Sequence, residues 1–306
     1  MKVKPAYRDV HGILLLDKPQ GLSSNQALQR AKRLFNARKA GHTGSLDPLA
    51  TGLLPICFGE ATKIAGYLLG ARKAYAAECR LGATTTTDDA QGEFVQTRPL
   101  PALDDAVIEA AMAPLRGRIT QTPPIYSALK QAGVPLYKRA RRGEDVQAPP
   151  REVDVFRFDL IEREGADLRL HVECGSGTYV RSLARDLGEA LGCGAHLTAL
   201  RRLWVEPFRE PIMWTLEQLG EIAAGGFEKL DALLLPTEQG LAALPTLALS
   251  SEQAVQLQQG KRYTQAVLVD CSLACALDTQ GRLVALVEID AAGEVRVRRG
   301  FTPVID

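Results

Sequence analysis

An aspartate in a glycine-rich segment is the residue of this sequence best placed to do chemistry. Asp47 lies within GHTGSLDPLATG (41–52), is followed by Pro48 and is flanked by Gly44 and Gly52. Proline restricts the backbone after the aspartate, and the glycines permit tight turns and close approach of a substrate. Such a loop would hold a carboxylate rigidly in the open. An Asx-type turn without chemistry fits the same residues, and composition alone does not separate the two interpretations.

Hydrophobic periodicity predicts the elements that must position this loop. The segment 75–81 alternates apolar and polar residues, which is typical of a strand with one buried face and directs Tyr75 inward. Further strands are predicted over about 12–17, 153–161 and 168–174, and helices over about 24–35, 61–69, 104–115 and 178–191. We therefore expect a sheet with helices packed on it. From about residue 246, short apolar strands separated by turns predict a small β-barrel or sandwich.

Composition narrows the class of protein. The chain has 306 residues, of which 46% are hydrophobic and 24% charged, which excludes a disordered chain or a small disulfide scaffold. No apolar run approaches the ~20 residues that a membrane span needs, and the N-terminal apolar run is too short for a signal peptide. We expect a cytoplasmic protein. The six cysteines form no C-x-x-C pair, so we interpret them as reduced, mostly buried thiols without zinc.

Charge is unevenly distributed along the chain. Residues 1–73 hold twelve Lys and Arg against four Asp and Glu, whereas the remaining residues hold 25 against 32. A second basic cluster, in 124–151, has six cations against two carboxylates. Solvated surface charge would explain either cluster alone. Together they favour a polyanion such as a nucleic acid as the partner.

The string GHTGSLDPLATGLLPICFGEATK, which contains Asp47, resembles the signature of the TruB family of pseudouridine synthases, which modify uridine 55 in the T loop of tRNA. Other segments are similar in the family's order: GILLLDKPQGLSS, KAYAAECRLG, TPPIYSALK, CGSGTYVRSLARDLGEALGCGAHLTALRRL and a C-terminal segment similar to a PUA domain. The resemblance covers nearly the whole chain. It implies an α+β catalytic domain over 1–245, with a largely antiparallel central sheet flanked by helices, an RNA-binding insertion at about 124–151, and a PUA-like β-barrel over 246–306.

The activity that the resemblance implies is an isomerisation. The N1–C1′ bond of uridine breaks, the uracil turns, and C5 joins C1′, so neither a cofactor nor a metal is required. The implied partner is tRNA, contacted at the T arm and, through the C-terminal domain with Arg296, Arg298 and Arg299, at the acceptor stem. We expect a monomer without an obligate protein partner.

The resemblance also assigns site residues. Asp47 is the catalytic aspartate, acting either as a nucleophile or as the base that removes the C2′ proton, and Arg181 would orient it. Tyr75 would stack on the uracil, and Asp89 would join the arginine network. The remaining residues are assigned to substrate binding: His42, Tyr179, Leu200, Lys18, Lys130, Arg139, Arg141 and Arg142.

Some alternatives stay open at this point. Relatives often carry Thr-Asp-Thr where this chain has Thr85-Thr86-Thr87, so Asp88 could influence the network in place of Asp89. A relative of the same chemistry that works with a guide RNA is one rival. A tRNA-binding or tRNA-folding module without catalysis is another, and a hydrolase with a metal on the two aspartates is the least favoured because no third ligand is evident.

Overall fold

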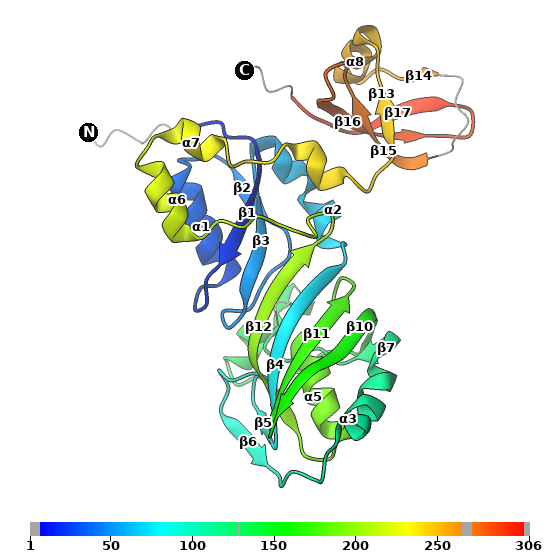
Figure 1. Ribbon diagram of the computed structural model, residues 1–306. Helices are drawn as coiled ribbons and strands as arrows, with labels where there is room; N and C mark the ends of the chain where they lie inside the picture. Colours follow the sequence, from blue (N-terminus) through cyan, green and yellow to red (C-terminus); the bar gives the residue numbers. More distant parts are fainter. Residues whose placement is uncertain (1–6, 128, 132, 265–270, 303–306) are drawn as a thin grey trace.

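A long, mostly antiparallel sheet runs through the larger, N-terminal part of the molecule (Figure 1). This computed structural model describes residues 7–302 except 128, 132 and 265–270. The sheet has eight strands in the order β1-β3-β12-β4-β11-β10-β7, with β2 paired to β3. Only β12 and β3 run parallel. The strands are β1 (Gly12–Lys18), β2 (Ala40–His42), β3 (Thr51–Phe58), β4 (Lys73–Leu81), β7 (Gly117–Gln121), β10 (Arg151–Glu164), β11 (Asp167–Cys174) and β12 (Ala195–Val205).

Helices flank this sheet, as the sequence predicts. They are α1 (Ser24–Leu34), α2 (Ala65–Leu69), α3 (Asp105–Met112), α5 (Val180–Ala190), α6 (Leu216–Ala223) and α7 (Phe227–Asp231), with 3-10 turns η1 (Gly59–Ile64), η2 (Ala113–Leu115) and η3 (Thr237–Leu241). The segment predicted as one helix over 61–69 is thus a 3-10 turn followed by a short α-helix. A capping box between Ser23 and Gln26 fixes the start of α1, whose apolar face includes Leu28 and Ala31.

The order of apolar and polar residues along each strand reflects which of its two faces are buried. In β1, Ile13 and Leu15 pack in one core, whereas Leu14 and Leu16 pack in another, so the strand is apolar throughout because both of its faces are covered. In β4 the alternation is regular, and Tyr75 points into the core, which confirms the predicted inward direction.

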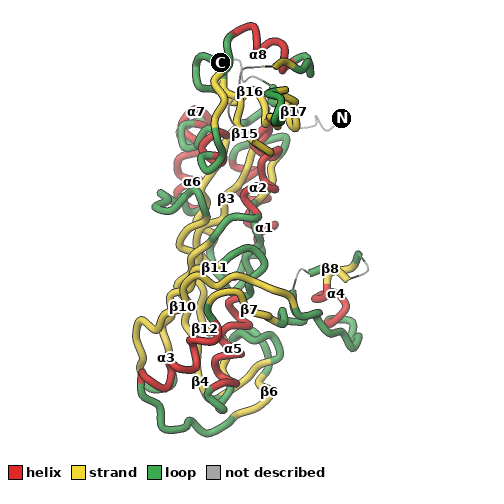
Figure 2. Tube along the Cα trace, turned by 90° about the vertical axis from the view of Figure 1, so that its right-hand side faces the viewer, coloured by secondary structure: helices red, strands yellow, loops and turns green. Residues whose placement is uncertain are grey.

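Two excursions leave the sheet. One is the hairpin of β5 (Ala83–Thr85) and β6 (Phe94–Thr97), whose turn carries the two aspartates at 88 and 89. The other is the insertion between β7 and β10, which contains β8 (Lys130–Gln131), β9 (Val134–Pro135) and α4 (Leu136–Ala140). Figure 2 shows α4 and β8 projecting away from the main body. The insertion has a small core of its own, built on Leu136, Val146 and Ala148.

A second sheet forms the C-terminal part, with the strand order β13-β15-β16-β17-β14. Its elements are β13 (Thr246–Ala248), α8 (Ser251–Gln258), β14 (Tyr263–Thr264), β15 (Cys271–Leu277), β16 (Leu283–Ile289) and β17 (Glu294–Gly300). The sheet curls into a half-barrel, which confirms the predicted architecture. A shared core in which Ile13 and Leu53 of the first sheet cluster with Leu286 and Phe301 of the second joins the two parts.

Five of the six cysteines are buried and all six are free thiols, which agrees with their interpretation as mostly buried. Within the part of the chain that the structure describes, no helix is long and apolar enough to cross a membrane.

Candidate active site

The loop that carries Asp47 lies between β2 and β3 and is anchored on both sides. The Leu46 amide donates to the hydroxyl of Ser24 over 2.7 Å, and that hydroxyl donates to the Leu46 carbonyl over 3.1 Å. The Pro48 carbonyl accepts from the amide of Gly21 at 2.7 Å. Leu46 and Leu49 are buried on either side of the aspartate. The Asp47 side chain is nevertheless 38% exposed, so a rigid loop presents a carboxylate that remains accessible.

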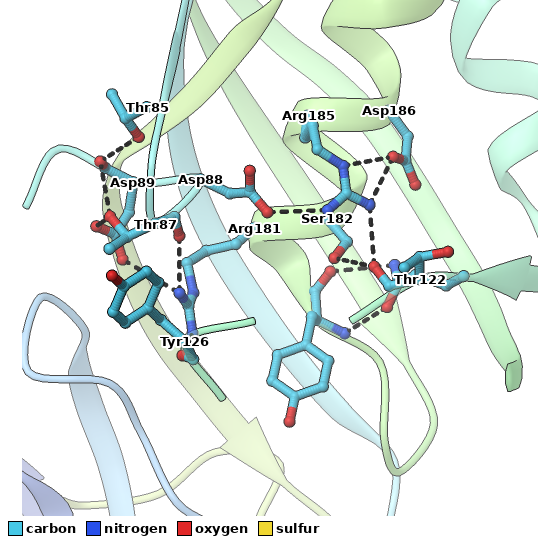
Figure 3. Close-up of polar contacts among 12 residues, drawn as sticks. Thr85, Thr87, Asp88, Asp89, Thr122, Tyr126, Arg181, Ser182, Arg185 and Asp186 are labelled. Carbon is cyan, nitrogen blue, oxygen red and sulfur yellow. Dashed lines mark hydrogen bonds and ion pairs between the residues drawn. The ribbon is translucent and has the colours of Figure 1, made fainter. Parts of the chain in front are cut away.

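Arg181, at the start of α5, reaches this carboxylate. Its Nη2 lies 2.9 Å from Oδ2 of Asp47, and the arginine side chain is only 4% exposed. The same guanidinium donates to the Thr87 carbonyl over 2.8 Å and to the Tyr126 carbonyl over 3.1 Å (Figure 3). Arg181 therefore connects the catalytic loop, the β5–β6 turn and the insertion. The predicted pairing of Asp47 with Arg181 is present.

The two neighbouring aspartates have different partners (Figure 3). Asp89 is buried, with Oδ2 at 3.6 Å from Nη1 of Arg181. Its Oδ1 accepts hydrogen bonds from the Thr87 hydroxyl over 2.6 Å and the Gln91 amide over 3.0 Å. Asp88 instead pairs with Arg185 at 2.9 Å. Of the two alternatives left open by the sequence, the structure brings Asp89 into the Arg181 network and directs Asp88 away from it.

Burial and charge oppose each other at Asp47. Burial raises the pKa of this carboxyl above its ordinary value and the charge of Asp89 adds to the rise, whereas the Arg181 guanidinium counteracts it. The ammonium group of Lys18 also favours the ionised form of Asp47. Lys18 is itself fully buried and donates to the carbonyls of Pro19 and Leu22. Burial lowers the pKa of Lys18 to about 8, with the Asp47 charge acting in the opposite direction.

Tyr75 enters the site from β4, the strand next to β12. It is paired in register with Arg202 of β12, and the guanidinium of Arg202 acts electrostatically on the phenol. Burial raises the pKa of Tyr75 to about 12, while the neighbouring guanidinium partly offsets the rise and the Asp47 carboxylate adds to it. The phenol is therefore protonated at neutral pH and lies within electrostatic range of Asp47.

Comparison with known proteins places this arrangement in a family. Residues 32–180 match the model of the TruB family pseudouridylate synthase (N terminal domain), and residues 181–242 match that of the tRNA pseudouridylate synthase B C-terminal domain. tRNA pseudouridine synthase B of Xanthomonas axonopodis pv. citri is 56% identical over 301 residues, which cover 98% of this chain and 97% of the relative. The protein of the same name from Xylella fastidiosa is 53% identical over 97% of each chain. The chain belongs to the TruB family of pseudouridine synthases.

Solved structures agree with the family assignment. A chain of a Cbf5-Nop10-Gar1 complex matches with a TM-score of 0.74 and 25% identity, covering 99% of this chain and 92% of that chain. A chain of an H/ACA RNP bound to a substrate RNA containing 2′-deoxyuridine also matches with a TM-score of 0.74 and 25% identity, over 96% and 86% of the two chains. The predictions of a pseudouridine synthase fold and of an isomerase are thus confirmed.

The structure places three further residues that were assigned from the TruB resemblance. His42 ends β2, and its Nδ1 is buried without a hydrogen-bond partner among the described residues. Burial and then the Arg202 charge lower the pKa of His42. Leu200 is buried opposite Ala77 of β4. Tyr179 precedes α5, and the Arg151 guanidinium lies 4.9 Å from the centre of its ring. Their contacts with substrate stay predictions.

The basic residues assigned to RNA binding differ in how free they are. In the insertion, Arg139 pairs with Glu144 at 2.6 Å. Arg141 and Arg142 are more exposed, and the Arg141 guanidinium lies over the Tyr137 ring. The side chain of Lys130 lies outside the described part of the chain. In the C-terminal sheet, Arg296 and Arg298 pair with carboxylates of the same sheet, whereas Arg299 lines a hollow with Lys39 and Lys63.

Sequence reasoning missed two buried cations at this site, Arg202 and Lys73. The Lys73 ammonium donates to the carbonyls of Leu69 and Ala71, and burial together with the Arg202 charge lowers the pKa of Lys73 to about 8. The signal that could have found Arg202 is its position two residues after Leu200, because residues i and i+2 of a strand share a face. No group of His, Cys, Asp or Glu among the described residues has the arrangement of a metal site.

Proposed function

We propose that this protein converts uridine 55 in the T loop of tRNA to pseudouridine. The observation that carries the proposal is the pair formed by Asp47 and Arg181, at 2.9 Å, on an anchored loop that leaves the carboxylate accessible. Relatives with more than half of their residues identical to this chain are named tRNA pseudouridine synthase B. The tRNA substrate follows from those names, and the T-loop position follows from the resemblance of the Asp47 segment.

The chemistry needs one carboxylate. A glycosidase uses two because water must attack the sugar while the leaving group is protonated. Here the detached uracil stays in the site and no water adds, so Asp47 can act alone, either by adding covalently or by removing the C2′ proton. Both roles require the ionised form, which the charges of Arg181 and Lys18 favour against burial. The step rearranges one nucleotide and consumes no cofactor.

Binding must expose a uridine that is stacked inside a folded loop. Extruding it costs a few kcal/mol, which stacking and hydrogen bonds in the pocket offset. Tyr75 supplies an aromatic face. Among the described residues, His42 Nδ1, Ser127 Oγ and Arg181 Nε are buried and lack hydrogen-bond partners. A bound nucleotide would satisfy such groups, whose lack of partners is otherwise costly.

The rest of the tRNA has two candidate contacts. Exposed cations of the insertion, Arg141 and Arg142, would bind phosphates of the T arm. The hollow lined by Lys39, Lys63 and Arg299, between the two sheets, would lie along the acceptor stem. One copy of the chain carries all of these groups, so we propose a monomer that acts on tRNA in the cytoplasm.

The test is to incubate purified protein with unmodified tRNA, without added cofactor, and to map pseudouridine by position. The wild type should modify position 55 and should leave a tRNA with cytidine at that position unmodified. Asp47→Asn keeps the size of the side chain but removes its charge, so it should abolish the product while tRNA affinity stays within about threefold of wild type. Product formation by Asp47→Asn would remove the proposed mechanism. Tight tRNA binding by the wild type without product would instead support a tRNA-folding module.

A further inference from the structure

Arg202 is a buried cation that the proposed reaction does not yet use. Its side chain belongs to a residue that is only 1% exposed. Nε donates to the Leu53 carbonyl over 2.6 Å, and Nη2 donates to the Gly44 carbonyl over 3.1 Å. Tyr75 is its cross-strand partner, and the guanidinium lies close enough to the phenol to act on it electrostatically. Among the described residues, no carboxylate lies within ion-pairing distance of it. Arg202 thus binds two backbone carbonyls and lies beside one phenol.

The contacts of Arg202 connect the loop that carries Asp47 with Tyr75 of β4. Gly44 and Gly52 flank Asp47 in the catalytic loop. The side chain of Arg202 holds the Gly44 carbonyl, and its backbone is paired with Gly52 where β12 meets β3. The approach at Gly52 is so close that a Cβ atom there would lie 2.2 Å from the Arg202 carbonyl oxygen. On its other side, β12 pairs Arg202 with Tyr75 of β4. Arg202 therefore contacts the Asp47 loop on both sides of the aspartate, at Gly44 and at Gly52, and it also lies beside Tyr75.

Stability alone is a poor reason for this charge. A buried cation without a carboxylate partner is expensive, and apolar side chains of similar volume commonly replace buried charges without loss of stability. Lys73 makes the position more expensive, because its ammonium group is buried close to the same guanidinium and the two charges repel each other. Burial lowers the pKa of Arg202 itself, and the nearby phenol opposes that shift. A role in aligning neighbouring groups explains the buried charge of Arg202 better than a contribution to stability does.

We propose that Arg202 is a positioning residue, which fixes the Tyr75 phenol and the Asp47 loop relative to each other so that the uridine is held between them. The inference rests on the proposed function for its catalytic consequence. In this proposal Arg202 acts through Tyr75 and the Asp47 loop, and it does not itself contact the sugar or the base. Its loss should therefore slow the isomerisation of bound uridine and leave tRNA binding largely intact, because tRNA affinity depends mainly on phosphate contacts elsewhere.

The experiment compares Arg202→Met and Arg202→Lys with Arg201→Met. Arg201 is the matched control, because it is the adjacent arginine and its side chain is paired with Asp17 at 2.7 Å, away from Tyr75. Single-turnover rates at saturating enzyme should fall about 100-fold for Arg202→Met and about 10-fold for Arg202→Lys, which keeps a charge but cannot span both carbonyls and the phenol. The dissociation constant for tRNA should change less than about threefold, and Arg201→Met should react within about threefold of wild type.

A spectroscopic measurement separates positioning from a general effect on folding. In protein labelled with 3-fluorotyrosine, the Tyr75 resonance is identified by its loss in Tyr75→Phe. We expect this fluorine resonance to shift in Arg202→Met and in Arg202→Lys, and to stay in place in Arg201→Met. The resonances of the other tyrosines should stay in place in all three, which shows that the variants are folded.

Several results would overturn the inference. An unchanged Tyr75 resonance in both Arg202 variants would show that the guanidinium does not hold the phenol. A loss of tRNA affinity equal to the loss of rate would make Arg202 a binding residue, and a wild-type rate in Arg202→Met would remove its role. If Arg202→Met does not fold, Arg202→Lys and its fluorine spectrum decide. If the wild type forms no pseudouridine, the proposed function fails, whereas the fluorine spectra still test the contact between Arg202 and Tyr75.

Discussion

The catalytic loop (41–52) and the insertion (124–151) are both irregular segments, and both contact Arg181, yet they are built in opposite ways. Arg181 binds the Asp47 carboxylate of the loop at 2.9 Å and the Tyr126 carbonyl of the insertion at 3.1 Å. The loop is fastened to the body of the protein through Ser24 and Gly21 and buries Leu46 and Leu49. The insertion packs mainly on its own small core around Leu136 and projects from the body (Figure 2).

The cations around the loop and those of the insertion also differ in how deeply they are buried. Around the loop, the cations Lys18, Arg181 and Arg202 are buried and each is held by backbone carbonyls, which fixes their positions. In the insertion, Arg141 and Arg142 remain exposed. A reacting group gains from a preorganised environment, whereas a phosphate contact gains from charge that can adapt to the RNA. We therefore expect substitutions at the loop to affect the rate and those in the insertion to affect affinity.

Among the variants that compare the loop with the insertion, Arg181→Ala should have the largest effect. This change leaves Asp47 and Asp89 without their shared cation, and breaking a buried pair in this way is strongly unfavourable. The single-turnover rate should fall about 10²–10³-fold, in the range observed when one preorganised charge-stabilising group is removed. The dissociation constant for tRNA, measured by filter binding, should rise only a few-fold.

Arg185→Ala is the matched control for that prediction. Arg185 lies one turn further along α5 and pairs with Asp88 and Asp186, not with Asp47. Its removal should reduce the rate less than about tenfold, because the groups that it leaves unpaired do not take part in the reaction. Equal losses of rate and affinity in Arg181→Ala would make Arg181 part of the RNA clamp and would break the contrast between loop and insertion.

A smaller effect, and on affinity, is expected in the insertion. Replacing Lys138, Arg139, Arg141 and Arg142 with alanine should weaken tRNA binding about 10- to 100-fold at low salt and should flatten the dependence of log K on log salt. The reaction rate of the saturated complex should stay within about fivefold of wild type. The measurement is a series of binding curves at several salt concentrations.

Three exposed arginines on the open face of the sheet provide the control for the insertion. Arg118, Arg157 and Arg169 are each paired with a nearby carboxylate. Replacing them with alanine removes a similar number of cations, yet should leave the salt dependence unchanged because these arginines lie on the sheet and not in the insertion proposed to contact phosphates. A salt slope that is equally steep in wild type and the insertion variant would take the insertion out of the interface with RNA.

Much of this fold could be predicted from the sequence because burial leaves a periodic signature. The alternation in β4 gave Tyr75 its direction, and the unbroken apolar run of β1 arises because both faces of that strand are covered. The loop around Asp47 was recognisable because Pro48 restricts the backbone, whereas Gly44 and Gly52 permit tight turns. The pairing of Asp47 with Arg181 came from the family resemblance, because the two residues are far apart in the sequence.

Other features depend on backbone details that have no periodic signature. Counting along β12 places Arg202 on the face of Leu200, but its contacts with the carbonyls of Leu53 and Gly44 depend on how β3 and the Asp47 loop pack against the strand. Asp88 has a positive φ of 58°, which is a left-handed backbone conformation. The side chains of the adjacent Asp88 and Asp89 point to different partners at this turn. The contacts of Arg202 and the separation of Asp88 from Asp89 therefore emerge only from the three-dimensional structure.

The smallest predicted effect is a shift in the pH dependence of the single-turnover rate, which tests whether the loop and the insertion act separately. In the proposed reaction Asp47 acts as a carboxylate, so the single-turnover rate should fall on the acid side as pH decreases through the raised pKa of this group. The Asp89 charge helps to raise that pKa. Asp89→Asn removes the charge but keeps an oxygen that can accept from Thr87, so the acid limb should move to lower pH, with a rate at neutral pH within about tenfold of wild type.

The sign of this shift is what distinguishes a local electrostatic effect from loosened structure. Removing a neighbouring negative charge makes the ionised form of Asp47 easier to reach, so the pKa of Asp47 can only fall through this interaction. The insertion variant with four alanines serves as the control, and its acid limb should coincide with that of wild type, because none of its substituted cations contributes to the pKa of Asp47. An acid limb that moves to higher pH in Asp89→Asn would show that the substitution loosens the site. An acid limb that moves equally in the insertion variant would show that the two segments are coupled more closely than their separate anchoring indicates.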